Sequence, residues 1–299
     1  TPFSPTGLRF GNFLLFPVLE QSFGFTTNAD QTANGGSSAF SQTEGRLTFQ
    51  SDWSVHQLRG EVGVSTVQYF SGDADALNAA DARAEFRLDI QRGWAARFGA
   101  SYELTTESAT SESIDLTTGQ VVSDRPLLQT YGGFAAIERT SGRLGGSLRT
   151  SLERSDFGNV SLADGSSASQ DDRNQSELKA VLRLTYELSP ALTPFVEASY
   201  GHRIFDQDLD ADGTNRDAAL IDVRAGATFD LSDKLRGELS LGYGLENYED
   251  GALPNLDGFT VHGSLAWSPE QLTTIAATAE TQLNGASGLG DAGSITYAT

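Results

Sequence analysis

The chain has 299 residues, no cysteine and no methionine, and its 40 acidic and 20 basic residues give a formal net charge of -20. Without cysteine it has no disulfide framework, no thiolate metal site and no cysteine nucleophile. The negative charge excludes nucleic acid as an expected partner, because phosphates are bound by clustered Lys and Arg.

The predicted elements are β-strands in which polar and apolar residues alternate. The clearest strand is 80–91, where Ala, Phe, Leu and Ile occupy one parity and Asp, Arg, Glu and Gln the other. A period of two places these sets on opposite faces of one strand. Such a strand spans roughly 35 to 40 Å, enough to cross a bilayer on a tilted path. In chain order, the thirteen predicted strands are 13–27, 40–50, 57–70, 80–91, 95–106, 127–140, 144–155, 175–188, 193–205, 218–231, 235–248, 258–267 and 272–283.

Short and long connections alternate along the chain. The short ones are 51–55, 92–94, 141–143, 189–191, 232–234 and 268–271, and the long ones are 28–39, 71–79, 107–126, 156–173, 206–217 and 249–257. Tight periplasmic turns and long external loops are typical of outer-membrane barrels, which cross the membrane with strands. The alternative is a soluble antiparallel sheet protein, but its strands would be shorter. No run of 18 or more apolar residues predicts a transmembrane helix.

Aromatic residues support the barrel interpretation. Trp53, Trp94 and Trp267 lie at or beside short turns, where an inner aromatic girdle is expected. The predicted outer girdle consists of Tyr69, Phe70, Tyr200, Phe205, Tyr243 and Tyr248. The sequence therefore predicts an all-β fold, a single antiparallel transmembrane β-barrel over residues 1–299, in the bacterial outer membrane.

Bacterial barrels have an even number of strands. The segment 294–299 is predicted to be part of a fourteenth strand, so we expect a chain that is truncated at its C-terminus. Three stretches also resemble the putative β-barrel porin 2 family of outer-membrane proteins: GLRFGNFLLFP at 7–17, LTPFVEA at 192–198 and FTVHGSLAWSPEQLTT at 259–274. The resemblance implies about sixteen strands when complete and an aromatic last residue, whereas this sequence ends on Thr299.

Charged side chains of both signs occupy the polar parity and are candidates for the pore lining. They are Glu44, Arg46, Arg59, Glu61, Arg83, Glu85, Arg87, Asp89, Arg97, Glu103, Arg149, Glu177, Lys179, Arg183, Glu197, Asp222, Arg224, Arg236 and Glu238. They indicate either a polar, ion-conducting pore or cross-strand ladders that only hold the wall. Because the two signs are nearly balanced, the wall alone predicts no strongly selective filter.

The long loops are acidic, and 206–217 resembles the first half of a calcium loop. Asp208, Asp210 and Asp212 alternate before Gly213, but Ala219 stands where a bidentate Glu is required. Calcium binding is one hypothesis, and a solvated acidic loop is the other. Acidic loops could also bind divalent cations shared with lipopolysaccharide or with a neighbouring protein. The loop 107–126 is long enough to fold inward as a constriction or plug.

An enzyme is not predicted. The histidines are His56, His202 and His262, and the sequence has neither a Gly-x-Ser-x-Gly elbow nor a His-Glu-x-x-His zinc motif. The expected function is a porin-like channel for passive diffusion of small hydrophilic solutes. The alternative is a structural or surface-interaction protein whose acidic loops bind divalent cations, neighbouring proteins or an external layer. The family resemblance implies a third hypothesis, passage of exported polysaccharide, which calls for aromatic residues on the polar parity. Expected partners are outer-membrane lipid, lipopolysaccharide and further copies or lateral protein partners.

Overall fold

The structure is a computed structural model, and it describes residues 7–29, 36–71, 76–107, 122–124, 126–162, 164–210, 213–232, 234–270, 273–284 and 294–298. Within these ranges it consists of β-strands, their connections and one short 3-10 helix, η1 (Asp171–Arg173). The described part of the chain contains no helix that is long and apolar enough to cross a bilayer.

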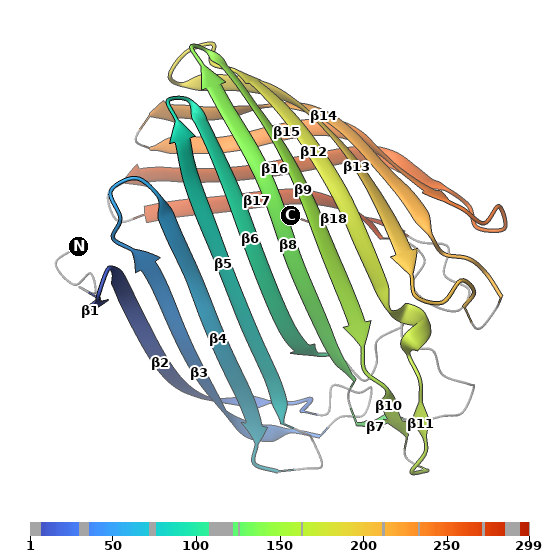
Figure 1. The fold of residues 1–299 in the computed structure, drawn as a ribbon. Coiled ribbons are helices and arrows are strands. Elements are labelled where there is room, and N and C mark those ends of the chain that lie inside the picture. Colours follow the sequence, from blue (N-terminus) through green and yellow to red (C-terminus); the bar gives the residue numbers. More distant parts are fainter. Residues whose placement is uncertain are drawn as a thin grey trace. The chain divides into compact units, whose positions relative to one another are not determined.

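Fifteen of the described strands form one sheet (Figure 1). They are β1 (Leu8–Phe10), β2 (Phe13–Thr26), β3 (Ser38–Ser51), β4 (Gln57–Tyr69), β5 (Leu77–Gln91), β6 (Trp94–Thr106), β8 (Leu127–Ser141), β9 (Leu144–Phe157), β12 (Gln175–Tyr186), β13 (Leu192–Phe205), β14 (Ala218–Ser232), β15 (Leu235–Tyr248), β16 (Leu256–Glu270), β17 (Thr273–Asn284) and β18 (Ser294–Ala298). Neighbours in the sheet follow each other in this same order. The thirteen predicted long strands and the short fourteenth are thereby confirmed.

A second, three-stranded sheet lies within the long connections. It consists of β7 (Val122–Asp124), β10 (Val160–Leu162) and β11 (Ser167–Ala168), in the order β11-β10-β7. Val160 and Leu162 are buried and pack with Ala168. The sequence did not predict this small sheet, because three-residue strands are too short to show a period.

The chain divides into two compact units. The first comprises Thr1–Asp89, Arg97–Phe134 and Glu153–Gln175, and the second comprises Ile90–Ala96, Ala135–Leu152 and Ser176–Thr299. The units are described separately below, and a single domain over 1–299 stays a prediction.

Strand pairing confirms the two-faced character of the strands. In the first unit, Arg59 lies opposite Glu85 and Glu61 opposite Arg83. On the other face of β4, the exposed Val62 and Val64 lie opposite alanines of β5. In the second unit the apolar residues opposite one another include Leu241 and Val261.

Nothing in the described residues packs a core against this apolar face. Large apolar side chains are exposed along it in both units, for example Val64, Leu152, Val223, Leu241 and Phe259. Contiguous exposed apolar surface is rare on soluble monomers and marks contact with a membrane or a protein. A sheet with a charged face and an uncovered apolar face is the pattern of a transmembrane barrel wall.

Several glycines of the sheet lie directly beneath a phenylalanine of the next strand. Phe40 lies opposite Gly24, Phe49 opposite Gly60, Phe195 opposite Gly226 and Phe229 opposite Gly237. At each of the four glycines the ring comes so close that an added Cβ would meet it. The ring covers backbone that glycine leaves bare, a device that restores the stability lost by placing glycine in a strand.

The Phe49–Gly60 pair gives a direct test. We expect Gly60→Val to destabilise the barrel by about 1 to 3 kcal/mol, because the new side chain meets the Phe49 ring and lies 2.6 Å from the Arg83 carbonyl oxygen. Gly45→Val is the control on the adjacent strand, since its Cβ has 3.4 Å to the nearest atom. Urea unfolding in lipid vesicles measures both, and equal midpoints would contradict the close approach.

Candidate functional site

In the first unit, the charged face carries one glutamate held by two arginines from its two neighbouring strands. Glu61 on β4 pairs with Arg46 on β3 and with Arg83 on β5, whose Nη2 lies 3.0 Å from Glu61 Oε1. The hydroxyl of Thr48 donates to Glu61 Oε2 at 3.3 Å. The carboxylate therefore joins three strands and has both oxygens engaged.

The same arrangement recurs one strand further. Glu85 on β5 accepts from Arg59 Nη2 at 3.1 Å and from Arg97 Nη1 at 3.4 Å. Next to it, Arg87 and Asp89 form a one-to-one pair at 2.9 Å. All eight of these charged residues were assigned to one wall by parity alone, and the structure brings them into contact as neighbours on one face.

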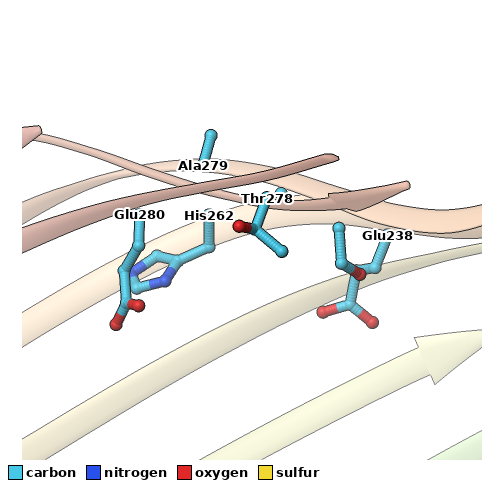
Figure 2. Close-up of a pocket in the computed structure, with 7 residues that line it drawn as sticks. Glu238, His262, Thr278, Ala279 and Glu280 are labelled. Carbon is cyan, nitrogen blue, oxygen red and sulfur yellow. The ribbon is translucent and has the colours of Figure 1, made fainter. Parts of the chain in front are cut away.

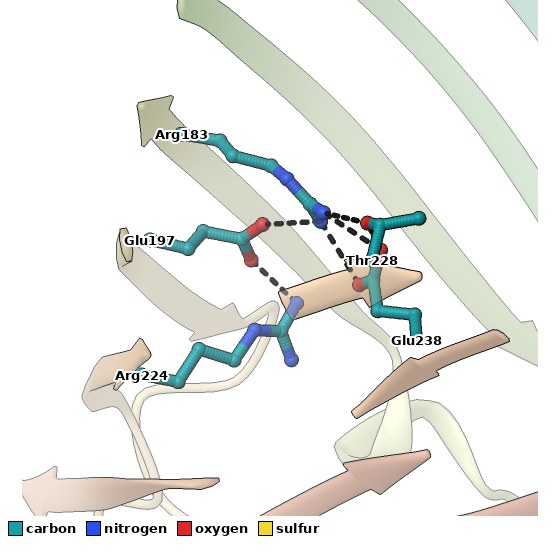
Figure 3. A network of polar contacts seen from close by, with 5 residues as sticks. All are labelled: Arg183, Glu197, Arg224, Thr228 and Glu238. Atoms are coloured by element: carbon teal, nitrogen blue, oxygen red, sulfur yellow. Dashed lines mark hydrogen bonds and ion pairs between the residues drawn. The ribbon is translucent and has the colours of Figure 1, made fainter. Parts of the chain in front are cut away.

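The second unit contains a third such cluster, on β12 to β15 (Figure 3). Glu197 pairs with Arg183 at 3.4 Å and with Arg224. Arg183 also donates to both oxygens of Glu238, at 3.1 and 2.7 Å. Its guanidinium lies 3.6 Å from the centre of the Phe195 ring, so a cation–π contact also holds the arginine in place.

A further charge cluster lies nearer the long-loop end of the second unit. Arg203 Nη1 donates to Glu246 at 2.7 Å, and its Nη2 lies 3.7 Å from Glu177. Glu246 is fully buried. Asp222 accepts from the Thr260 hydroxyl at 2.9 Å. Glu246 was missing from the predicted lining, although it shares the parity of Glu238, and extending that parity to the end of the strand would have found it.

The predicted lining residues are not all brought into ion pairs. Among the residues that the structure describes, Glu103, Lys179 and Arg236 form none, and Glu44 accepts from Gln42. Whether these side chains line an aqueous pore stays a prediction.

The connection after β9 folds over the charged face of the first unit. Arg173 binds Glu107 through two hydrogen bonds of 2.8 and 3.1 Å, and its guanidinium lies 3.9 Å from the centre of the Phe157 ring. Phe157 has the same parity on β9 as Glu153 and therefore shares the charged face. The next residue, Asn174, accepts the Phe157 N–H at 2.7 Å. These contacts therefore hold the base of the loop against the charged face of β9.

The connection after β13 repeats this arrangement in the second unit. The Arg216 guanidinium lies 4.6 Å from the centre of the Phe205 ring, and the following Asp217 accepts the Phe205 N–H at 2.8 Å. After β15, Asn255 accepts the N–H of Tyr248 at 3.0 Å. We call this arrangement the aromatic–Asx clasp: an aromatic residue near the end of a strand whose N–H donates to an Asn or Asp at the far end of the loop.

The predicted outer girdle is wrong at Tyr69, Phe205 and Tyr248. Phe205 and Tyr248 are buried, and all three have the parity of the charged face, with Tyr69 opposite Phe40. On the apolar face, Tyr243 packs edge-on against Phe259, with 5.4 Å between the ring centres. Aromatic contacts at the short-turn end include Trp53 with Phe13 and Phe86.

The predicted calcium loop is partly described, and Asp212 lies outside the described residues. Asp210 accepts the Thr214 N–H at 2.9 Å, and its other oxygen lies 3.4 Å from Nε of Arg216. In the described part of the chain no cluster of three or more potential ligands is arranged to hold a metal ion. Calcium binding through Asp208, Asp210 and Asp212 stays a hypothesis. Most of the loop 107–126 also lies outside the described ranges.

A recess of about 610 Å³ lies on the second unit, between β15, β16 and β17. Figure 2 shows Glu238, His262, Thr278 and Glu280 on one side of these strands and Ala279 on the other. His262 lies directly opposite Glu280.

The other two histidines lie outside this recess. His56 accepts the Asp89 N–H at 3.3 Å, and His202 lies 3.3 Å from Glu249. None of these contacts assembles a nucleophile with a base.

Three solved structures illustrate what the chain is similar to. The FpvAI–pyocin S2 complex matches at a TM-score of 0.44 and 11% identity over 81% of this chain, which spans 41% of that one. The NanC porin matches at 0.37 and 9% identity over 84% of this chain and 98% of that one. The TodX monoaromatic hydrocarbon channel matches at 0.40 and 9% identity over 90% and 83%. No match is found among curated proteins.

The family model described as putative beta-barrel porin 2 matches residues 1–299, the whole sequence. Its description agrees with the alternating strands, the sheet order and the uncovered apolar face. The fold is therefore an antiparallel transmembrane β-barrel wall, and the family supports an outer-membrane channel rather than an enzyme. The chain belongs to the putative β-barrel porin 2 family.

Proposed function

We propose that this protein is an outer-membrane channel through which small hydrophilic solutes diffuse passively. The observation that carries the proposal is the division of the sheet into one face of paired charges and one face of exposed apolar side chains. A barrel of about sixteen strands is wide enough to leave an aqueous path, and a wall of charged pairs keeps that path wet.

Single-channel conductance of the full-length protein in a planar bilayer tests the proposal. We expect stable current steps whose conductance rises in proportion to salt concentration, because ions in a wide aqueous path move much as in bulk water. Bilayers exposed to detergent alone are the control. A folded, inserted protein that passes no current would contradict the proposed function.

The second candidate is a surface-interaction protein whose acidic loops bind divalent cations, a neighbouring protein or an external layer. The acidic loops and the net charge favour it. The pairing of Asp210 with Arg216 weighs against calcium there, because the carboxylate already has a cationic partner. Repeating the bilayer measurement with calcium, and assaying calcium-dependent association of the protein, separates the two functions.

A further inference from the structure

We infer that the preferred solutes carry an anionic group, a carboxylate or a phosphate, and that they bind to arginines on the charged wall of the channel. The inference rests on the proposed channel function and names its solute class. It comes from two observations on the clusters of the first unit: how many arginines share each glutamate, and which of the two kinds of side chain is more exposed to water. Counting charges along the sequence shows neither.

In the two clusters of the first unit the ratio is two arginines to one carboxylate. In the first unit, Arg46 and Arg83 share Glu61, and Arg59 and Arg97 share Glu85. Each pair of arginines brings ten N–H donors to a carboxylate that has about four acceptor positions. One position of Glu61 is already taken by the Thr48 hydroxyl. The two clusters together carry a local charge of about +2.

Exposure differs between the partners in the same direction. The side chain of Glu61 is 14% exposed and that of Arg83 is 68% exposed. Glu85 is 25% exposed and Arg59 is 56% exposed. The carboxylates lie against the sheet and the guanidinium groups extend beyond them. A solute that moves along this wall meets cationic donors first, although the wall is nearly neutral by count.

In the second unit one carboxylate, Glu197, is shared in the same way, although Glu238 also pairs with Arg183 and gives the whole cluster two arginines and two carboxylates. Glu197 is buried between Arg183 and Arg224, and both arginines are more exposed than it is (Figure 3). A planar guanidinium whose N–H groups reach water matches the geometry of carboxylate and phosphate, which accept two parallel hydrogen bonds.

Other carboxylates on the same face of the first unit define the extent of this arginine band. Asp81 and Glu103 lie nearer the long-loop ends of β5 and β6 than Arg83 and Arg97 do. The band therefore extends from the middle of the strands, at Arg83, toward the short turns. Because acidic loops repel anions at the opposite mouth, we expect anions to bind more readily from the short-turn side.

The test uses the full-length protein in a planar bilayer, with the reversal potential under a potassium chloride gradient and inorganic phosphate as the added anion. We expect chloride to permeate more readily than potassium, and phosphate to reduce the chloride current. The double variant Arg59→Gln, Arg83→Gln should weaken the phosphate effect at least about threefold, because two charge-assisted donors are lost.

Two further variants make the result specific. Arg9→Gln is the matched control, because Arg9 pairs with Asp52 outside the clusters and should leave the phosphate effect unchanged. Glu61→Gln should strengthen the preference for chloride, since it removes the shared carboxylate and keeps both arginines. An open channel that prefers potassium and ignores phosphate overturns the inference but not the channel function. A folded protein without any conductance overturns both.

Discussion

The substitution Val64→Arg is expected to cost about 2 to 4 kcal/mol of barrel stability, because it places a cation in the lipid near the middle of a strand. Val64 lies near the centre of β4 and is 57% exposed on the apolar face. Folding into lipid vesicles, followed by urea unfolding and by gel mobility with and without heating, measures the effect. The folded fraction should fall strongly at room temperature.

Ser65→Arg is the matched control, one residue further along the same strand. Ser65 has the parity of Glu61 and lies opposite Glu44 on β3, so its new guanidinium would enter the charged face beside a carboxylate. We expect little change in stability. If Ser65→Arg were the damaging substitution and Val64→Arg the tolerated one, the two faces would have been assigned the wrong way round.

The substitution Arg173→Ala is expected to be the most damaging change outside the membrane-facing surface. The side chains of Arg173 and Glu107 are only 5% and 16% exposed, and removal of the arginine leaves the glutamate without this partner in a poorly hydrated place. Breaking a buried pair from one side costs about 3 to 5 kcal/mol. Because the loss falls on one loop, we expect local opening of the segment after β9, measured by the rate of limited proteolysis and by hydrogen exchange.

Arg154→Ala provides the comparison for this loop. Arg154 lies 2.6 Å from Asp156 on the same strand, and both side chains are more exposed than the Arg173–Glu107 pair. Such exposed pairs contribute about 0 to 1 kcal/mol. If both variants had the same protection in the 158–173 segment, Arg173 would not fix the base of the loop.

The strands were predictable because alternation is a local signal that each strand carries in full. The predicted 235–248 strand is β15 itself, and the other long strands differ by a few residues at their ends. The predicted 127–140 strand, in which Gly132-Gly133 and Ala135-Ala136 blur the alternation, is the fifteen-residue β8. Its Phe134 covers Gly99 of β6, so aromatic and glycine residues that blur the parity along one strand have a role between strands.

The loops were not predictable in the same way, because their structure depends on contacts between distant residues. Arg173 meets Glu107 across 66 positions of sequence. The aromatic–Asx clasp has only a weak signal, an Asn or Asp that directly precedes a strand, as Asn174 and Asp217 do. Composition identifies such a segment as acidic and polar, but it does not show that an arginine in it is buried.

The charged wall was more predictable than the loops but less predictable than the strands. Parity found most of its members, but a count of charges treated each arginine and each carboxylate as equal. The structure shows that Glu61 and Glu197 are each shared by two arginines. Sharing depends on the strand register, because three strands must align for one carboxylate to reach both partners.

The sign of the charges along β5 also affects how the barrel can assemble. A slip of two residues between β4 and β5 preserves both faces, so hydrophobicity alone cannot reject it. On the charged face of β5 the order is Asp81, Arg83, Glu85, Arg87, Asp89, with the sign changing at every step. A two-residue slip in either direction would therefore place Glu61 opposite a carboxylate and Arg59 opposite another arginine, instead of the opposite charges that face them now. Each such contact is unfavourable. The charge ladder on the wall therefore also selects the correct register when strands pair during assembly. It destabilises the two-residue slip, which burial of the apolar face in the membrane would not disfavour.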